Sequence, residues 1–334
     1  MPDPGFAPTQ ATLQGDNADI YFLRARDILE AEGRDPDVVM EVFARRQAWL
    51  CGMCEVEELL RHALAGTESV VDRLPEGSSF APMEPVLRIS GRYRAFGRFE
   101  TALLGTLASE TGWATAARSC VDAAGGIPIV HFGARHVHPD VSHRLEYAAV
   151  IGGCTGCATP GGARLAGLEP SGTMPHALIL LYGDTLAAAE AFDRTIDEGI
   201  NRLVLVDTFR DEIEESVRVA TTLGERLWGV RLDTPSELGG VTPELVTGVR
   251  RGLDDAGHEG VKILVSGGMT PERIATFVEA ESAVDGFGVG SHISGARAVD
   301  FTADLKQVEG LAVAKRGRQP GSTPNPRLER LDLA

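Results

Sequence analysis

The stretch 261-VKILVSGGMTPERI-274 joins an apolar run to two glycines and then to a Thr-Pro-Glu helix start. A second apolar run, 284-VDGFGVGSHI-293, follows the helical stretch and also ends in a glycine-rich cluster. Upstream, β-rich runs recur at 127-IPIVHFG-133, 202-RLVLVDT-208 and 228-WGVRLDT-234, and amphipathic helical stretches separate the later ones. Strands that alternate with helices of this length indicate a parallel sheet with crossover helices.

Polar or glycine-rich residues stand at the carboxyl end of one run after another. Asp207, Asp233, the cluster 266–268 and the cluster 288–291 end four successive runs. An open doubly wound sheet concentrates its functional residues at one switch point, whereas a (β/α) barrel carries them around its carboxyl-terminal rim. We therefore favour an irregular α/β barrel, with the N-terminal region packed beside it.

Charge and hydropathy exclude several classes of partner. The formal net charge is −16 and only three lysines occur, so an anionic ligand has to be held by local arginines and backbone amides. An acidic chain repels nucleic acid and anionic membranes. No apolar stretch is long enough to span a bilayer, and the N-terminus lacks a basic leader followed by an apolar segment. We expect a cytoplasmic protein without nucleic-acid or membrane partners.

The five cysteines include two Cys-x-x-Cys pairs, Cys51/Cys54 and Cys154/Cys157. A four-thiolate zinc site would need both pairs together, yet about a hundred residues separate them, unlike zinc-ribbon spacing. The histidines at 131, 136 and 138 match no ligand pattern either. We expect small buried cysteines and no metal bound directly by thiolate or imidazole.

The glycine clusters predict a phosphate site. Gly267 and Gly268, preceded by Ser266, lead into a helix, and Gly288 and Gly290 end the last barrel strand. In barrels this region commonly binds phosphate through glycine amides and a helix N-terminus. The alternative is that the glycines only form tight turns.

The two aspartates and two arginines predict a charged rim. Asp207 and Asp233 could coordinate Mg²⁺, hold ribose hydroxyls or stabilise a cationic transition state, or could instead cap the helices that follow. Arg231 lies two residues before Asp233, so on a strand both side chains share a face. Arg135 follows another strand, and an arginine fork suits a carboxylate or phosphate.

His176 lies in 172-GTMPHALIL-180, before an apolar run of strand or buried-helix type. A lone buried histidine is usually structural. Beside rim phosphate and carboxylate groups, a nucleophilic or acid–base role is the better hypothesis.

Eight motifs in this order resemble those of nicotinate phosphoribosyltransferases, specifically the shorter archaeal and bacterial form with the type II phosphoribosyltransferase fold. The resemblance covers about residues 18–318, and its motifs are DIYFLRARDIL, FGARHVHP, IGGCTGC, GTMPHALIL, LVDTFRDE, GVRLDTPSE, LVSGGM and DGFGVGSHI. It implies an N-terminal α/β domain over 1–124 and an active-site barrel over 125–300. It also implies that a C-terminal segment over 301–334 returns to the open-faced first domain.

The resemblance also implies the reaction and its participants. Nicotinate and 5-phosphoribosyl 1-pyrophosphate would give nicotinate mononucleotide and pyrophosphate, with Mg²⁺ bound mainly through the substrate pyrophosphate. ATP would be a coupled co-substrate through a phosphohistidine at His176. Pro175 and Ala177, where longer relatives carry alanine and serine, weaken the case for obligatory coupling. The active sites would be shared within a homodimer or a higher homo-oligomer.

Individual roles follow from the matching positions. Tyr21 would stack on the pyridine ring from the partner subunit, Arg135 and Arg231 would line the base and ribose-phosphate region, and Asp207 and Asp233 would lie near the ribose and Mg²⁺-pyrophosphate. The remaining substrate-binding positions are Thr173, Ser266, the 5′-phosphate glycines Gly267, Gly268, Gly288 and Gly290, and the pyrophosphate contacts Lys315 and Arg316.

Three rival functions remain open. A quinolinate enzyme of the same fold should need a denser basic pocket with lysines, yet the first lysine of the chain is Lys262. A nicotinamide enzyme would need a hydrogen-bonding carboxylate in the base pocket, where Thr155 is expected. A non-catalytic phosphate-binding barrel would bind nucleotide without turnover.

Overall fold

The computed structural model describes residues 5–333, which form two compact units. One unit comprises the chain up to Thr115 together with the chain from Ala296 onward, and the other comprises Ala116–Gly295. The predicted boundary after residue 124 follows the end of helix α5 (Glu100–Ala123), whereas the structure divides the chain inside that helix. Leu103 and Leu107 in its first part join the core of the first unit, which explains the difference.

The first unit is an antiparallel sheet with helices. Its strand order is β13-β12-β1-β5-β3-β14, and the short strands β2 and β4 pair separately. The strands are β1 (Asp37–Ala44), β2 (Ala48–Trp49), β3 (Val70–Arg73), β4 (Ser79–Phe80), β5 (Pro85–Arg92), β12 (Phe301–Val308), β13 (Leu311–Ala312) and β14 (Glu329–Arg330). The helices besides α5 are α1 (Gln10–Gln14), α2 (Ile20–Ala31), α3 (Met53–Leu64) and α4 (Tyr93–Phe96).

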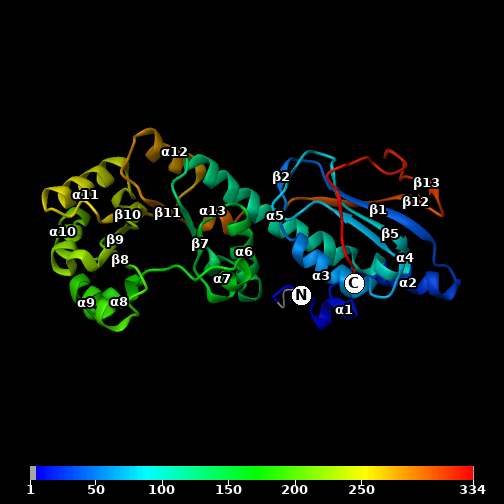
Figure 1. The fold of residues 1–334 in the computed structure, drawn as a ribbon, viewed down its shortest axis with the longest axis horizontal. Helices are drawn as coiled ribbons and strands as arrows, with labels where there is room; N and C mark the ends of the chain where they lie inside the picture. Colours follow the sequence, from blue (N-terminus) through cyan, green and yellow to red (C-terminus); the bar gives the residue numbers. More distant parts are fainter. Residues whose placement is uncertain (1–4, 334) are drawn as a thin grey trace. The chain divides into compact units, whose positions relative to one another are not determined.

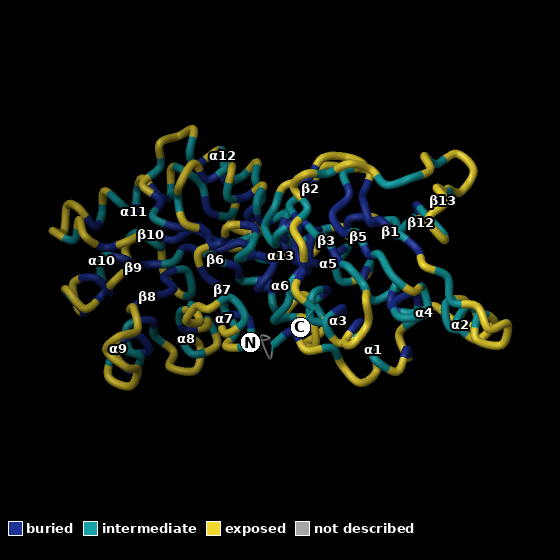
Figure 2. Tube along the Cα trace, turned by 45° about the vertical axis from the view of Figure 1, so that its right-hand side comes forward, coloured by how far each residue is buried: buried dark blue, intermediate teal, exposed yellow. Residues whose placement is uncertain are grey.

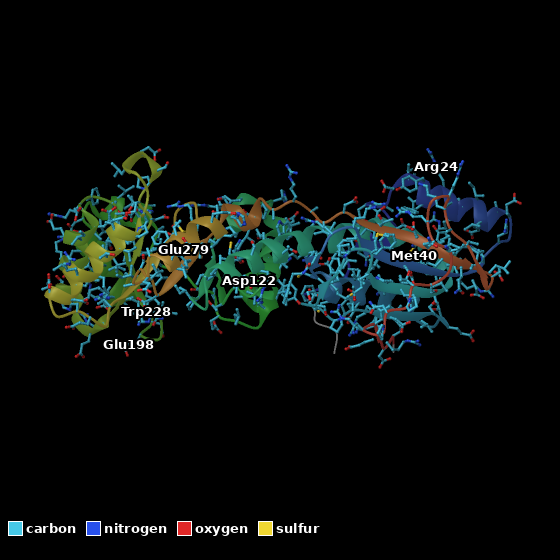
Figure 3. The ribbon with its side chains drawn as sticks, turned by 90° about the horizontal axis from the view of Figure 1, so that it is seen from above. Arg24, Met40, Asp122, Glu198, Trp228 and Glu279 are labelled. Carbon is cyan, nitrogen blue, oxygen red and sulfur yellow. The ribbon has the colours of Figure 1, made fainter. Side chains whose placement is uncertain are left out.

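The C-terminal segment supplies strands of the first unit's sheet. β12 pairs with β1 along its whole length, from Val38↔Val308 to Ala44↔Phe301. Figure 3 labels Met40 on β1, which is buried in the core of this unit, and Arg24 on α2, which is exposed.

The second unit is a six-stranded parallel half-barrel in the order β7-β6-β11-β10-β9-β8, with crossover helices (Figure 1). Its strands are β6 (Ile129–His131), β7 (Gly156–Cys157), β8 (Arg202–Leu205), β9 (Leu227–Leu232), β10 (Lys262–Val265) and β11 (Gly286–Val289). Its helices are α6 (Pro139–Ile151), α7 (Pro160–Ala166), α8 (His176–Tyr182), α9 (Thr185–Thr195), α10 (Glu212–Leu223), α11 (Pro243–Asp255), α12 (Pro271–Glu279) and α13 (Ser291–Ser294).

The alternation read from the sequence accounts for this sheet. Each of β8, β9, β10 and β11 is mostly or wholly buried (Figure 2), as expected for strands covered on both faces. Helices α11 and α12 both begin with a threonine whose hydroxyl caps the first turn, followed by proline. Between β7 and β8 the chain forms α7, α8 and α9 without a strand, so the sheet keeps edges at β7 and β8.

The apolar run after His176 is more exposed than its composition predicts. It forms α8, in which Leu180, Leu181 and Tyr182 are 59%, 84% and 50% exposed and only Ile179 is buried. Apolarity alone does not show which face of a short helix finds a neighbour.

Each described helix differs from a membrane-spanning helix in length or in apolarity. None of them within residues 5–333 combines the length and apolarity that crossing a bilayer requires.

Candidate active site

Parallel pairing brings the carboxyl ends of β8, β9 and β10 to one edge of the half-barrel. Val265 of β10 pairs with Leu232 of β9, and Leu205 of β8 pairs with Arg231. Asp207, Asp233 and Ser266 follow these positions within one or two residues. The prediction of a polar rim therefore has a direct geometric basis.

Arg231, Asp233 and Ser266 form one hydrogen-bonded cluster. Arg231 Nε donates to Ser266 Oγ at 2.8 Å, and its Nη2 donates to Asp233 Oδ2 at 3.3 Å. The Ser266 hydroxyl lies 2.8 Å from Asp233 Oδ1, to which it donates. Each Asp233 oxygen thus has one fixed donor and keeps acceptor capacity.

Arg231 also lies over an aromatic ring. Its guanidinium carbon is 4.7 Å from the centroid of the Phe132 ring. Burial lowers the pKa of Arg231 from its ordinary value, and the nearby charge of Arg135 acts in the same direction. Asp233 and Asp207 oppose that shift, so four of the predicted charged residues share one electrostatic environment.

His176 and Asp207 form the second pair. His176 is the first residue of α8, and its Nε2 lies 3.1 Å from both carboxylate oxygens of Asp207. The imidazole is 38% exposed and the carboxylate 2%. The hydrogen bond that Asp207 accepts raises the pKa of His176 above its ordinary 6.5, and the charge of Asp233 adds to the effect. The imidazole is therefore partly open to solvent and does not lie in a closed core.

Neither aspartate caps the helix that follows it. Asp211 caps α10 through the amides of Ile213 and Glu214, and the short helical turn after Asp233, Ser236–Leu238, has Pro235 at its cap position and no side-chain capping bond. The capping alternative for Asp207 and Asp233 is wrong, because other residues already occupy the cap positions.

Two of the four predicted phosphate glycines adopt a backbone conformation that favours glycine. Gly267 and Gly268 have φ of 86° and 63°, in the left-handed region. Gly288 has a steric requirement instead, because a Cβ there would lie 2.6 Å from the Phe132 ring. Gly290 has a φ of −120° and directly precedes α13. Gly267, Gly268 and Asp233 line a cavity of about 610 Å³.

Two other predicted contacts have a different local setting. The hydroxyl of Thr173 donates to the carbonyl of Leu203, so it joins the loop before α8 to strand β8. Arg135 lies exposed in the turn Ala134–His136, where its charge reaches Arg231. Thr155, expected near the base, donates to the carbonyl of Ile129 at 3.1 Å.

Three predicted residues belong to the first unit. Tyr21 is 59% exposed on α2, and its hydroxyl donates to Asp19 at 3.0 Å, which raises the pKa of Tyr21. Lys315 and Arg316 are exposed after β13. Their roles in the site stay predictions.

The sequence did not reveal several residues that pack against the rim or hydrogen-bond to it. Phe132 occupies the space left by Gly288, and Glu212 accepts a 2.6 Å hydrogen bond from the Thr234 hydroxyl. Arg273 of α12 donates to carbonyls of the glycine loop. The missing side chain at Gly288 was the one available signal, because a glycine inside a strand indicates a close approach.

The histidines near β6 do not converge. His131 is fully buried, 3.8 Å from Glu146, which accepts the Ala158 and Thr159 amides at the start of α7. His136 pairs with the Ser294 hydroxyl, and His138 lies beside Asp140 on the surface.

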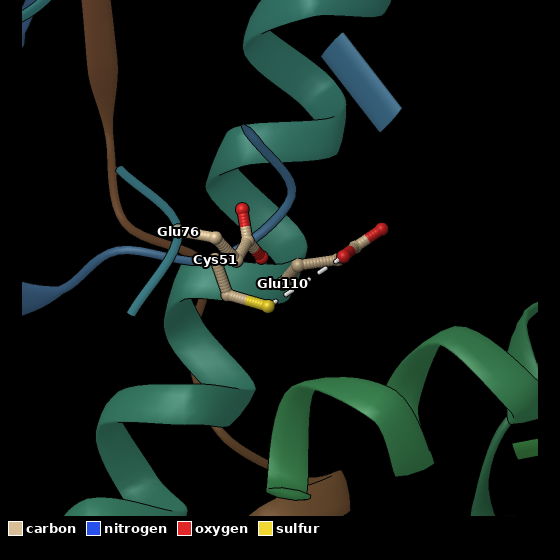
Figure 4. A group of neighbouring side chains, drawn as sticks. All are labelled: Cys51, Glu76 and Glu110. Carbon is tan, nitrogen blue, oxygen red and sulfur yellow. Dashed lines mark hydrogen bonds between the residues drawn. The ribbon is translucent and has the colours of Figure 1, made fainter. Parts of the chain in front are cut away.

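Within the described residues, one group has metal-type donor atoms within 4.8 Å of one another: Cys51, Glu76 and Glu110 (Figure 4). Glu76 accepts the amides of Gly52 and Cys54 at the start of α3, and the Cys51 thiol lies 3.7 Å from Glu110. Burial raises the pKa of the Cys51 thiol well above its ordinary range. Cys51 is therefore better described as a protonated thiol than as a thiolate ligand, and the Glu76 carboxylate binds the amides at the start of α3. Cys154 and Cys157 belong to the other unit.

Comparison with protein families now assigns the chain. The model described as "Quinolinate phosphoribosyl transferase, N-terminal domain" matches residues 19–110, and the model of the C-terminal domain matches residues 113–304. The chain belongs to the quinolinate phosphoribosyl transferase family. These matches confirm the predicted fold, an irregular α/β barrel with an additional α/β domain. They also confirm the resemblance at the level of a type II phosphoribosyltransferase.

Several known proteins are similar to this chain over most of its length. A crystal structure of nicotinate-nucleotide pyrophosphorylase from Pyrococcus furiosus is 42% identical, with a TM-score of 0.88 over 95% of this chain and 81% of that one. The nicotinate phosphoribosyltransferase pncB2 of Mycobacterium tuberculosis is 31% identical over 275 residues, 80% of this chain. That match spans 58% of the relative's length. Human nicotinic acid phosphoribosyltransferase, 21% identical with a TM-score of 0.75 over 91% of this chain and 77% of that one, shares the fold.

Proposed function

We propose that this protein transfers the phosphoribosyl group of 5-phosphoribosyl 1-pyrophosphate to nicotinate in NAD salvage, releasing nicotinate mononucleotide and pyrophosphate. The observation that carries the proposal is that the His176–Asp207 pair and the Arg231–Asp233–Ser266 cluster lie within electrostatic reach of one another. The names of the similar proteins from Mycobacterium tuberculosis support nicotinate as the acceptor.

The carboxylates suit the charge that develops in this reaction. When the bond between the anomeric carbon and pyrophosphate breaks, positive charge builds on the ribose ring, and a nearby carboxylate stabilises it. Asp233 fits that role because Arg231 and Ser266 fix both of its oxygens in place. The glycine amides suit the negatively charged 5′-phosphate of the ribosyl substrate.

Mg²⁺ would enter with the pyrophosphate and neutralise the leaving group. The carboxylates present fit an ion that is held mainly by the substrate. Both Asp207 oxygens face His176, and both Asp233 oxygens already accept a hydrogen bond. Asp233 retains acceptor capacity for a metal-bound water.

The acceptor base is decided by the groups facing its substituents. Nicotinate carries one carboxylate, and Arg135 is the exposed cation of the rim that suits it. Quinolinate carries a second carboxylate, which would leave as carbon dioxide if the same mononucleotide formed. Nicotinamide is disfavoured, because Thr155 supplies a hydroxyl already bonded to Ile129 and no carboxylate.

Coupling to ATP would use His176. An ionised Asp207 carboxylate can accept hydrogen bonds but cannot donate them, so this pair favours the His176 tautomer that carries its proton on Nε2. In that tautomer the lone pair of Nδ1 is the nucleophile. Nδ1 would attack the γ-phosphorus of ATP, and the bond to the bridging oxygen would break as ADP leaves. Phosphohistidine would then favour a closed, substrate-tight state.

The test is to incubate purified protein with 5-phosphoribosyl 1-pyrophosphate, Mg²⁺ and one base, with and without ATP, and to quantify mononucleotide and pyrophosphate. Nicotinate should give both products. Turnover with quinolinate and release of carbon dioxide, without turnover of nicotinate, would replace the proposed acceptor. Binding without product for every base would favour the non-catalytic reading.

ATP coupling needs its own variant. His176→Ala should abolish ATP stimulation and ADP formation while leaving some basal transfer. Unchanged ATP dependence in this variant would refute the phosphohistidine.

A further inference from the structure

Arg273 of α12 connects two loops at the rim. Its Nη1 donates to the carbonyl of Gly267 at 2.7 Å and to that of Gly268 at 3.2 Å. Its Nη2 donates to the carbonyl of Val241 at 3.1 Å. Gly267 and Gly268 lie between β10 and α12, and Val241 lies between β9 and α11, so one guanidinium joins consecutive loops.

The start of α12 fixes the position of that guanidinium. Thr270 caps the helix, and its hydroxyl accepts the backbone amide of Arg273 at 3.3 Å. Pro271 occupies the first turn, where its fixed φ favours the helix. The side chain of Arg273 therefore reaches back over the loop from a rigid origin.

The bound carbonyls determine where the neighbouring amides point. Across a trans peptide bond the C=O and the following N–H point in opposite directions, and no cis bond occurs within the described residues. Holding the carbonyls of Gly267 and Gly268 toward Arg273 turns the amides of Gly268 and Met269 away from it. Among the backbone hydrogen bonds of the described chain, neither amide has an acceptor.

We propose that Arg273 is a positioning residue that holds the Gly268 and Met269 amides ready for the 5′-phosphate of the ribosyl substrate, and that it does not bind this phosphate itself. The inference rests on the proposed function, since that function supplies the phosphate. Successive amides in left-handed or turn backbone form concave anion sites. Without the guanidinium, Gly267 and Gly268 regain their rotational freedom and the amides lose their common direction.

The test compares Arg273→Gln with Arg250→Gln. Arg250 of α11 is a matched control, because it donates to the carbonyls of Val261 and His258 at 2.7 and 2.9 Å, at the opposite end of β10. Both variants lose an arginine that binds backbone. Arg273→Lys, which can retain one carbonyl contact, is the conservative rescue.

Three quantities are measured for each variant: steady-state constants for both substrates, the Kd for inorganic phosphate by calorimetry, and amide hydrogen exchange across residues 266–270 without ligand. We expect Arg273→Gln to raise KM for the phosphoribosyl substrate and the phosphate Kd about tenfold, equal to about 1.4 kcal/mol. The nicotinate KM should be nearly unchanged, loop exchange should rise, Arg273→Lys should be intermediate, and Arg250→Gln should resemble wild type.

Two results would overturn the inference. Unchanged KM, phosphate Kd and loop exchange would remove any role for Arg273, and weaker phosphate binding with unchanged loop exchange would make it a direct ligand. If the Gln variant does not fold, the Lys variant decides by the same criteria. Wild-type protein that turns over no base would contradict the proposed function, whereas phosphate Kd and exchange would still test the loop.

Discussion

Asp233 is the residue whose environment most clearly suits the transition state. Its two oxygens have different fixed donors, Ser266 Oγ at 2.8 Å and Arg231 Nη2 at 3.3 Å. A carboxylate fixed in this way needs little reorganisation when charge develops beside it.

Asp233→Asn should lower kcat by about 10²–10³-fold, because the amide keeps the shape and loses the charge. Nicotinate binding should change far less. Stopped-flow turnover and equilibrium titration with nicotinate measure the two effects separately. Asp285→Asn, which loses the ion pair with Lys262 at the start of β10, is the control and should stay active. Equal losses in turnover and binding for Asp233→Asn would count against a transition-state role.

His176 should titrate above its ordinary pKa of 6.5, because Asp207 stabilises the imidazolium. Its NMR titration should therefore shift downward in Asp207→Asn. A folded pKa above the unfolded one means that the pair stabilises the protein fully below the unfolded pKa. That contribution is lost as pH rises through the folded pKa. The urea midpoint of wild type minus that of His176→Gln should shrink accordingly, and a difference that grows with pH would contradict the pairing.

At the scale of elements, β11 depends on a missing side chain. Phe132 extends from the end of β6 across Gly288, and Arg231 lies over the same ring. The strand therefore leaves space for the ring that supports an arginine of the rim.

Gly288→Ala should destabilise the protein by about 1–3 kcal/mol through overpacking. It should also weaken substrate binding, since displacing Phe132 moves the support of Arg231. Urea unfolding and the KM for the phosphoribosyl substrate report the two effects. Gly260→Ala is the matched control, because no atom lies within 4 Å of the added Cβ. A stable Gly288→Ala variant with normal KM would show that the ring moves without consequence.

At the scale of the whole molecule, the resemblance predicts active sites that are shared between subunits. Tyr21 is exposed on α2, a helix in which no residue is buried. The resemblance assigns this tyrosine to the pyridine ring bound by a partner subunit, in a homodimer or higher oligomer.

Mixing Tyr21→Ala with Asp233→Asn, each of low activity, should restore about a quarter of wild-type activity after subunits exchange in a two-fold dimer. Half of the dimers would be mixed, and each mixed dimer would contain one site with both residues intact. Mixing Tyr21→Ala with itself is the control. A fully active wild-type monomer, or no recovery after confirmed exchange, would remove the shared-site assignment.

Particular residues show where sequence reasoning succeeded at the site. The placement of Arg231 and Asp233 on one face followed from strand periodicity, and their contact at 3.3 Å agrees with it. The capping alternative for Asp233 could not be dismissed from the sequence, because aspartate is a good cap residue and Thr-Pro-Ser-Glu follows Asp233. Only the structure excluded this role, because Pro235 stands at the cap position of the turn Ser236–Leu238 and no side chain caps it.

The sequence by itself determined the alternation of strands and helices, the polar strand ends and the glycine loops. These features depend on periodicity and on local backbone preference, which a few neighbouring residues specify. The tertiary structure alone decided that Arg273 reaches Val241, that Phe132 covers Gly288, and that α8 leaves Leu181 exposed. These contacts join segments far apart in the chain, and their partners depend on how whole elements pack, which no local pattern specifies.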